Sequence, residues 1–338
     1  MKKIKVEDSV GYSLFHDVTA MKDGFKGAWF KRGHIIEEKD VEVLLDLGKR
    51  YIFVPEDEDK DIHEEECAVR MAKCLEMEGV HFEGPSEGKM DMYCDVNGMF
   101  TLNSEVLKKL NSIPDITVTS IPNHFPVKPG DKIMSMRIVP LFTDESNISE
   151  FEKVMAGEEL ARVYEYKELT VGIVITGSEI YTGRIKDRFE PIIRKKLGEF
   201  PARISDVSIC DDDVEMIKEA AKTFIEKGAD ILIFSGGMSV DPDDVTPTAI
   251  KSLGADIVTY GVPAQPGNMT LISYIGEVAA IGVPGAAVSK PVTVLDVILP
   301  QLFCKIKFSK ENLVELGNGG LCMSCKSCHF PNCTFGRY

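Results

Sequence analysis

The chain has 338 residues, which exceeds the usual size of one compact core, so we expect two or three domains. Its net charge of −15 argues against binding nucleic acid through a broad basic face, because neutralising phosphates requires clustered lysine and arginine. No stretch approaches the roughly 20 apolar residues of a membrane span, and the charged first residues lack the apolar core of a signal peptide. We therefore expect a cytosolic protein that takes a small ligand and contacts neither nucleic acid nor membrane.

The first 60 residues combine short helix and strand patterns. Between Glu37 and Gly48 the apolar residues recur at helical spacing, and residues 51–54 follow as a short apolar strand. The acidic run at 56–66 fits a metal-gathering loop or a solvated linker and helix start, and such runs are more often solvated. We place an N-terminal α/β segment at residues 1–60.

An α+β region is expected over residues 61–166. A turn before Lys132 leads into a strand at 132–139, and Ser104 is the expected cap of the second helix. Helical patterns lie at residues 67–80, 104–110, 148–155 and 158–167.

From Thr170 onwards apolar strands alternate with helices. The strands are expected at residues 171–175, 204–209, 231–234, 256–260 and 277–283, and the helices at 187–197, 211–227, from 247, and at 286–303. Asp211 is the expected cap of the second of these helices. Such alternation predicts a parallel sheet covered on both faces. We therefore expect a three-layer α/β domain with a mostly parallel sheet at residues 167–306, followed by a short cysteine-rich tail at 307–338.

Four loops that follow the strands carry unusual residues. In doubly wound sheets ligands bind at the carboxyl ends of the strands. Glycines let a ligand approach the backbone, exposed amides suit an anion, and Asp241, Asp243 and Asp244 can hold a hard cation. Each loop alone is typical of a turn or helix cap, but their equivalent positions in one sheet indicate a ligand site. The loops lie at residues 176–187, 211–213, 235–244 and 263–268, with 282–285 behind the last.

Three common nucleotide and acyl-transfer sites are excluded by their missing motifs. The loop at residues 176–179 has one glycine, and the chain contains no Gly-x-Gly-x-x-Gly of a Rossmann dinucleotide site. It also lacks the phosphate loop Gly-x-x-x-x-Gly-Lys-Ser/Thr and the Gly-x-Ser-x-Gly elbow.

Seven motifs occur in the order and spacing of a known family: Thr176-Gly-Ser-Glu-Ile, Gly183-Arg-Ile-Lys-Asp, Asp211-Asp, Ser235-Gly-Gly-Met-Ser-Val, Asp244-Val-Thr-Pro, Gln265-Pro-Gly and Gly282-Val-Pro-Gly. As a set they resemble the molybdopterin-binding domain of molybdenum cofactor biosynthesis proteins of the MoeA and MogA/MoaB type. The tail resembles that of a branch with cysteine-rich ends. The resemblance implies a homo-oligomer that binds a phosphorylated pterin.

Two enzymes share this domain, and the chain mixes their motifs. The resemblance implies a Mg²⁺-dependent molybdenumtransferase-like enzyme that inserts molybdate into adenylylated molybdopterin, because residues 235–240 match the inserting enzyme. Asp244-Val-Thr-Pro resembles the adenylylating enzyme instead, and Gln265 stands where the inserting enzyme has a lysine. An adenylyltransferase, a non-catalytic carrier that passes cofactor to a molybdoenzyme client, and an enzyme acting on another phosphate ester are the alternatives.

The resemblance also assigns site residues. Glu179, Asp212 and Asp244 match carboxylates that the family places around Mg²⁺, molybdate or pyrophosphate, so they are the expected catalytic and metal-binding residues. The expected pterin-binding and phosphate-binding residues are Thr176, Gly177, Ser178, Asp187, Ser235, Gly236, Gly237, Ser239, Pro266, Gly267, Pro284 and Gly285.

The nine cysteines fall into two groups. Five are scattered, as is typical of free thiols. The other four, Cys322, Cys325, Cys328 and Cys333, fall within twelve residues, a spacing that suits a Cys₄ zinc site or an iron–sulfur centre. A reduced tail without a metal is the alternative.

Overall fold

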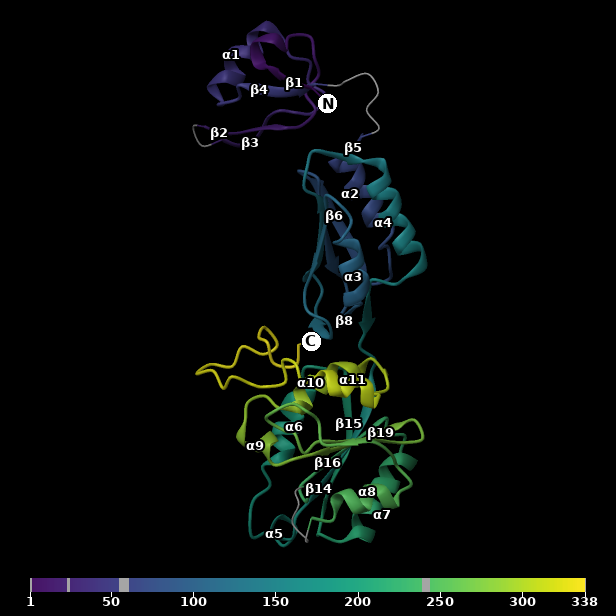
Figure 1. Cartoon of the computed structure of the whole chain (residues 1–338). Helices are drawn as coiled ribbons and strands as arrows, with labels where there is room; N and C mark the ends of the chain where they lie inside the picture. The colour runs from purple at the N-terminus through teal and green to yellow at the C-terminus, as the bar shows by residue number, and fades with distance from the viewer. Residues whose placement is uncertain (1, 23–24, 55–60, 239–243, 338) are drawn as a thin grey trace.

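The computed structural model describes residues 2–22, 25–54, 61–238 and 244–337. It shows an N-terminal region (2–54), a middle region (61–166) and a C-terminal domain (167–306) arranged in a row, with the tail (307–337) at the junction of the last two (Figure 1). Separate apolar clusters fill the N-terminal and middle regions, and two more cover the faces of the C-terminal sheet.

The N-terminal region is built from two small antiparallel pairs and a helix. Strand β1 (Lys2–Lys5) pairs with β4 (Tyr51–Val54), β2 (Val18–Lys22) pairs with β3 (Phe25–Phe30), and the turn η1 (Val6–Asp8) follows β1. The predicted helix is α1 (Glu38–Asp46), which starts at a capping box between Glu37 and Asp40. The predicted strand at residues 51–54 is β4.

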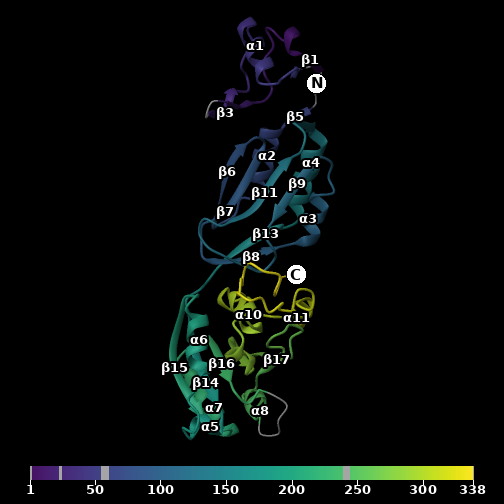
Figure 2. The same cartoon turned by 90° about the vertical axis from the view of Figure 1, so that its left-hand side faces the viewer.

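In the middle region, helices α2 and α3 pack against a four-stranded antiparallel sheet of order β6-β7-β11-β9 (Figure 2). The strands are β5 (Asp61–His63), β6 (Val80–Ser86), β7 (Lys89–Cys94), β8 (Gly98–Leu102), β9 (Ile116–Ser120), β10 (Phe125–Val127), β11 (Lys132–Ile138), β12 (Phe142–Asp144) and β13 (Ala161–Glu165). The helices are α2 (Glu64–Lys73), α3 (Ser104–Leu110) and α4 (Glu145–Gly157).

Three predictions for the middle region are wrong. Helix α2 ends at Lys73, so the helix expected over residues 67–80 is too long. Residues 161–165 form strand β13, because pairing with β8 outweighs their weak helical pattern. The cap of α3 is Asn103, whose side chain accepts hydrogen bonds from the backbone N–H groups of Glu105 and Val106.

The C-terminal domain contains a six-stranded mixed sheet of order β15-β14-β16-β19-β18-β17. Strands β14, β15, β16 and β19 run parallel, whereas β18 is antiparallel to both its neighbours. Strand β18 was absent from the sequence prediction. The strands are β14 (Leu169–Thr176), β15 (Ala202–Cys210), β16 (Ile231–Ser235), β17 (Asp256–Tyr260), β18 (Leu271–Ile275) and β19 (Val278–Val283).

Successive residues of the central strands point to opposite sides of this sheet. Ile173 and Ile233 join a cluster with α6 and α10, whereas Val174 and Phe234 join a cluster with α7 and α8. The helices are α5 (Ser178–Tyr181), α6 (Phe189–Leu197), α7 (Val214–Glu226), α8 (Thr246–Ser252), α9 (Ala286–Ser289) and α10 (Val294–Phe303).

Two details of these helices differ from expectation. The single helix expected over residues 286–303 is divided into α9 and α10, and a capping box between Thr293 and Asp296 begins α10 just after Pro291. Helix α7 is capped by Asp213 rather than Asp211, since the Asp213 carboxylate accepts from the Met216 N–H.

The tail is packed against the C-terminal domain. Its helix α11 (Lys310–Glu315), which the sequence did not indicate, buries Leu313, and Phe335 is buried near the chain end. Gln265 donates its N–H to Gly320 O (2.7 Å) and accepts from the Cys322 N–H (2.9 Å). These bonds hold the tail against the loop between β17 and β18.

Candidate functional site

The loops of interest open at one edge of the sheet. The register aligns the ends of the parallel strands, pairing Thr176 with Cys210 and Ser235 with Val283. Because β17 and β18 are antiparallel, the loop that joins them, residues 261–270, opens at the same edge. The sheet topology therefore brings together loops that are far apart in sequence.

These loops surround a cleft of about 540 Å³, which we call the strand-end cleft. Ten of the residues expected to form the site line it: Thr176, Gly177, Glu179, Asp212, Gly236, Gly237, Asp244, Gly267, Pro284 and Gly285. Ser239, Asp241 and Asp243 lie outside the described residues. Four predicted residues do not line the cleft. Ser178, Ser235 and Pro266 are next to lining residues in sequence, and Asp187 hydrogen-bonds to the N–H of the lining residue Phe189.

The glycine turn at the end of β16 fits only residues without a side chain. Gly236 has φ +99°, and a Cβ there would overlap the carbonyl oxygen of Thr176. Gly237 has φ +54°, and its Cβ would lie 2.7 Å from Thr246 Oγ1. The turn therefore keeps its backbone close to the floor of the cleft.

A buried hydroxyl pair holds this turn in place. The hydroxyl of Thr246, the first residue of α8, donates to Gly236 O (3.0 Å) and also contacts Thr176 Oγ1 (3.0 Å). Thr246 was not among the predicted site residues, although it belongs to the Asp244-Val-Thr-Pro motif. The hydroxyl of the fully buried Ser235 has no hydrogen-bond partner in the described structure.

Ser178 orients the acidic loop after β15. Its N–H donates to Asp212 Oδ2 (2.8 Å), and its hydroxyl donates to Asp211. The bond from Ser178 is the main reason why the pKa of Asp211 is lowered. Ser178 thus positions carboxylates at the rim of the cleft rather than lining it.

Asp187 and Pro266 have structural roles here. The Asp187 carboxylate accepts from the N–H groups of Phe189 (2.8 Å) and Glu190 (2.9 Å), so it satisfies the first two N–H groups of α6. Pro266 O accepts from the Val294 N–H (3.0 Å), which ties the β17–β18 loop to the start of α10. Their predicted contacts with a ligand stay predictions.

Tyr260, at the end of β17, was missed by the sequence analysis. Its hydroxyl donates to Met238 O (3.1 Å), which braces the segment after the glycine turn. Burial, and then the negative charge of Asp244, raise the pKa of this phenol. The pattern that predicted a strand at residues 256–260 contains no signal for this contact.

No preformed metal cage is present in the part of the chain that the structure describes. It contains no group of three or more His, Cys, Asp or Glu side chains placed to hold an ion. In the tail, Cys325 and Cys328 are exposed, Cys322 and Cys333 are half-buried, and all four are free thiols. A tail metal therefore stays a prediction. Among the described helices, none has the length and apolar character needed to cross a membrane.

A cleft at the strand ends of an α/β sheet, with a glycine turn and carboxylates, defines a small-ligand-binding domain. Residues 172–303 match the family model described as "Probable molybdopterin binding domain", and residues 3–56 match a "Domain of unknown function (DUF8806)". Residues 172–303 of the C-terminal domain therefore match the molybdopterin-binding family, which confirms the resemblance.

Curated relatives match only part of the chain. A CinA-like protein of Mycobacterium tuberculosis (strain ATCC 25177 / H37Ra) is 39% identical over 75 residues, covering 22% of this chain and 17% of the relative. One from Mycobacterium leprae (strain TN) is 37% identical over 75 residues, covering 22% of this chain and 18% of the relative. The match thus spans about a sixth of the length of these relatives.

Solved structures resemble about two fifths of the chain. The tungsten cofactor synthesizing protein MoaB from Pyrococcus furiosus is 23% identical with a TM-score of 0.35, covering 40% of this chain and 94% of that one. The protein CinA with unknown function from Thermoplasma acidophilum is 18% identical with a TM-score of 0.35, covering 39% of this chain and 97% of that one.

Proposed function

We propose that the chain is a Mg²⁺-dependent molybdopterin molybdenumtransferase-like enzyme, which binds adenylylated molybdopterin in the strand-end cleft and inserts molybdate. The observation that supports this most is the meeting of the glycine turn at Gly236 and Gly237 with Glu179, Asp212 and Asp244 in one cleft. We also propose the four segments 1–60, 61–166, 167–306 and 307–338 as domains and tail. Helices on both faces of the sheet favour the three-layer arrangement.

The cleft suits a phosphorylated ligand on its glycine side. The backbone at Gly236 and Gly237 packs closely against Thr176 and Thr246, and both glycines line the cleft. Peptide N–H groups in such glycine turns can bind phosphate oxygens. In a chain of net charge −15, anion binding also requires local compensation of charge.

The carboxylates fit Mg²⁺ that is shared with a ligand. Mg²⁺ prefers oxygen ligands and is usually held by one or two carboxylates together with substrate phosphates, not by a cage of protein groups. Glu179, Asp212 and Asp244 line one cleft without forming a closed cluster, which agrees with that mode. When bound, the ion would neutralise phosphate charge, and Ser178 would orient Asp212 towards it.

The test compares three purified variants in molybdate-dependent cofactor formation from adenylylated molybdopterin. Asp244→Asn and Glu179→Gln should each lower the rate by about a hundredfold, because each removes a negative charge from the proposed ion site. The matched control is Asp256→Asn, at the exposed start of β17 on the opposite edge of the sheet. Equal rates in all three variants and the unmodified protein would refute the proposal.

A second candidate is a cofactor carrier. It is favoured by the backbone pairing of Gln265 with the tail, which links a loop of the cleft to the exposed thiols of Cys325 and Cys328. A client molybdoenzyme would then dock near the tail. Tight binding of mature cofactor without turnover of the adenylylated compound would favour the carrier, and ATP-dependent formation of that compound would favour the adenylyltransferase.

A further inference from the structure

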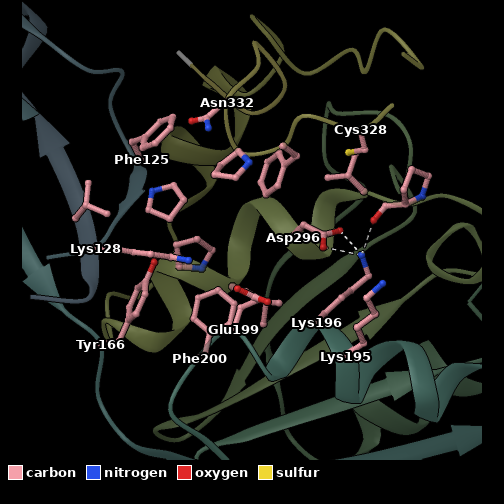
Figure 3. A pocket seen from close by; sticks show the side chains of 18 of the residues that line it. Phe125, Lys128, Tyr166, Lys195, Lys196, Glu199, Phe200, Asp296, Cys328 and Asn332 are labelled. Atoms are coloured by element: carbon pink, nitrogen blue, oxygen red, sulfur yellow. Dashed lines mark hydrogen bonds and ion pairs between the residues drawn. The ribbon is translucent and has the colours of Figure 1, made fainter. Parts of the chain in front are cut away.

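A second cavity lies away from the strand-end cleft. It has a volume of about 980 Å³ and is lined by residues of the middle region, helices α6, α9 and α10, and the tail (Figure 3). We call it the junction cavity. Such a volume is at the upper end of the range for small-molecule sites, which are commonly found between domains.

Aromatic rings form much of its wall. Tyr166 and Phe200 meet edge to face with ring centroids 5.1 Å apart. The Arg337 guanidinium lies over the rings of Phe125 (4.5 Å) and Phe330 (5.3 Å), so it joins the middle region to the tail beside the cavity. These four aromatic residues all line the cavity and give it flat apolar surfaces.

The lining is positive although the chain is strongly acidic. It contains five lysines and three carboxylates, in a chain of net charge −15. Figure 3 shows Lys196 bound to Asp296 on one wall, where the Nζ atom lies 2.6 Å from the carboxylate. Lys132 is likewise paired, with Asp91 (2.9 Å).

The three other lysines that line the cavity are not neutralised by an ion pair with a described residue. Lys128, Lys195 and Lys290 are exposed, and none takes part in the ion pairs found between described residues. They come from the middle region, helix α6 and the segment after α9. Cations from three separate segments therefore face one cavity with aromatic walls.

The tail wall is held by a buried contact. Arg337 donates to His124 O (3.1 Å) and to Pro331 O (3.2 Å), linking the middle region to the segment that carries Phe330. Burial lowers the pKa of Arg337 to about 10, still well above neutral pH, so the group stays charged. The cavity is thus a built feature of the packed junction.

We propose that the junction cavity binds a small molecule that combines a flat ring with a phosphate or carboxylate group. The ring would lie against Tyr166, Phe200 or Phe330, and the anion would meet Lys128, Lys195 or Lys290. This inference does not depend on the function proposed for the strand-end cleft, which shares no lining residue with this cavity.

The probe is 8-anilino-1-naphthalenesulfonate, a fluorescent compound with flat rings and a sulfonate. Lys128→Gln combined with Lys195→Gln should weaken its binding about tenfold. The matched control combines Lys108→Gln with Lys153→Gln, two exposed lysines of the middle region outside the cavity. Equal affinity of the two double variants would overturn the proposal.

Location is tested with the full chain by thiol modification. Cys328 lines the cavity, whereas Cys325, which is also exposed, does not. The bound probe should slow iodoacetamide alkylation of Cys328 about fivefold relative to Cys325, measured by mass spectrometry of the tail peptides. Equal slowing of both would place the probe elsewhere and refute the site. Displacement of the bound probe distinguishes the two anions. If adenosine monophosphate displaces it at lower concentration than benzoate, the cavity prefers a phosphate, and the reverse order indicates a carboxylate.

Discussion

The strand-end cleft and the junction cavity are sites of opposite character in one chain. Among the described residues, the cleft is lined by three carboxylates and a glycine turn, and by no lysine or arginine. The junction cavity carries five lysines and several aromatic rings. A phosphate in the first requires a cation as partner, whereas an anion in the second would meet protein cations directly.

The two sites also differ in construction. The cleft belongs to one sheet, whose strand register holds every loop at the same edge. The junction cavity depends on packing between separate regions and on the tail contact through Arg337. Substitutions in the strands and strand-end loops should therefore affect the cleft by straining the backbone. Substitutions where the regions meet should affect the cavity by loosening the packing between them.

The largest expected effect is that of Gly236→Ala in the cleft. The new Cβ would overlap Thr176 O at a φ of +99°, which side chains rarely adopt, so we expect a loss of about 3 kcal/mol in the free energy of unfolding. Urea denaturation monitored by circular dichroism measures this loss of unfolding free energy.

The control for this change is Gly254→Ala. Gly254 also has a positive φ, +77°, but a Cβ there would meet no atom within 4 Å. Its replacement should cost about 1 kcal/mol from backbone conformation alone. If both variants lose the same free energy, the close contact with Thr176 does not constrain the turn.

The sequence predicted the cleft better than the junction for a physical reason. Gly236, Gly237 and Asp244 lie within one short motif, and strand alternation alone places their loop at the sheet edge. Lys128, Lys195 and the tail are distant in sequence, and no periodic pattern relates them. The antiparallel strand β18 was missed because residues 271–275 are short and apolar, without a helix before them.

Acidification should weaken the junction more than the cleft. Burial, and then the charge of Arg337, lower the pKa of His124 to about 4 from an ordinary value near 6.5. The unfolded chain therefore binds this proton first as pH falls. The stability held above pH 6.5 is lost progressively down to about pH 4, and the loss between pH 7 and pH 5 should be about 2 kcal/mol.

The measurement is urea denaturation at pH 7 and pH 5 for the unmodified chain and for His124→Asn. Asparagine tolerates the positive φ of 53° at this position and does not titrate. The variant should lose less stability than the unmodified chain over the same interval. An identical pH dependence of the two proteins would show that His124 is not the group responsible.

The smallest expected effect returns to the cleft and tests its hydroxyl pair. Thr246→Val keeps the shape of the side chain but leaves Gly236 O and Thr176 Oγ1 without their buried partner, at a cost of about 1 kcal/mol. Thr223→Val, which removes only an exposed hydroxyl bonded to Glu219 O within α7, should change stability by less than about 0.5 kcal/mol. Chemical denaturation of both variants gives the difference. Equal losses would mean that water replaces the Thr246 hydroxyl, so the glycine turn would be held by its backbone and not by this side chain.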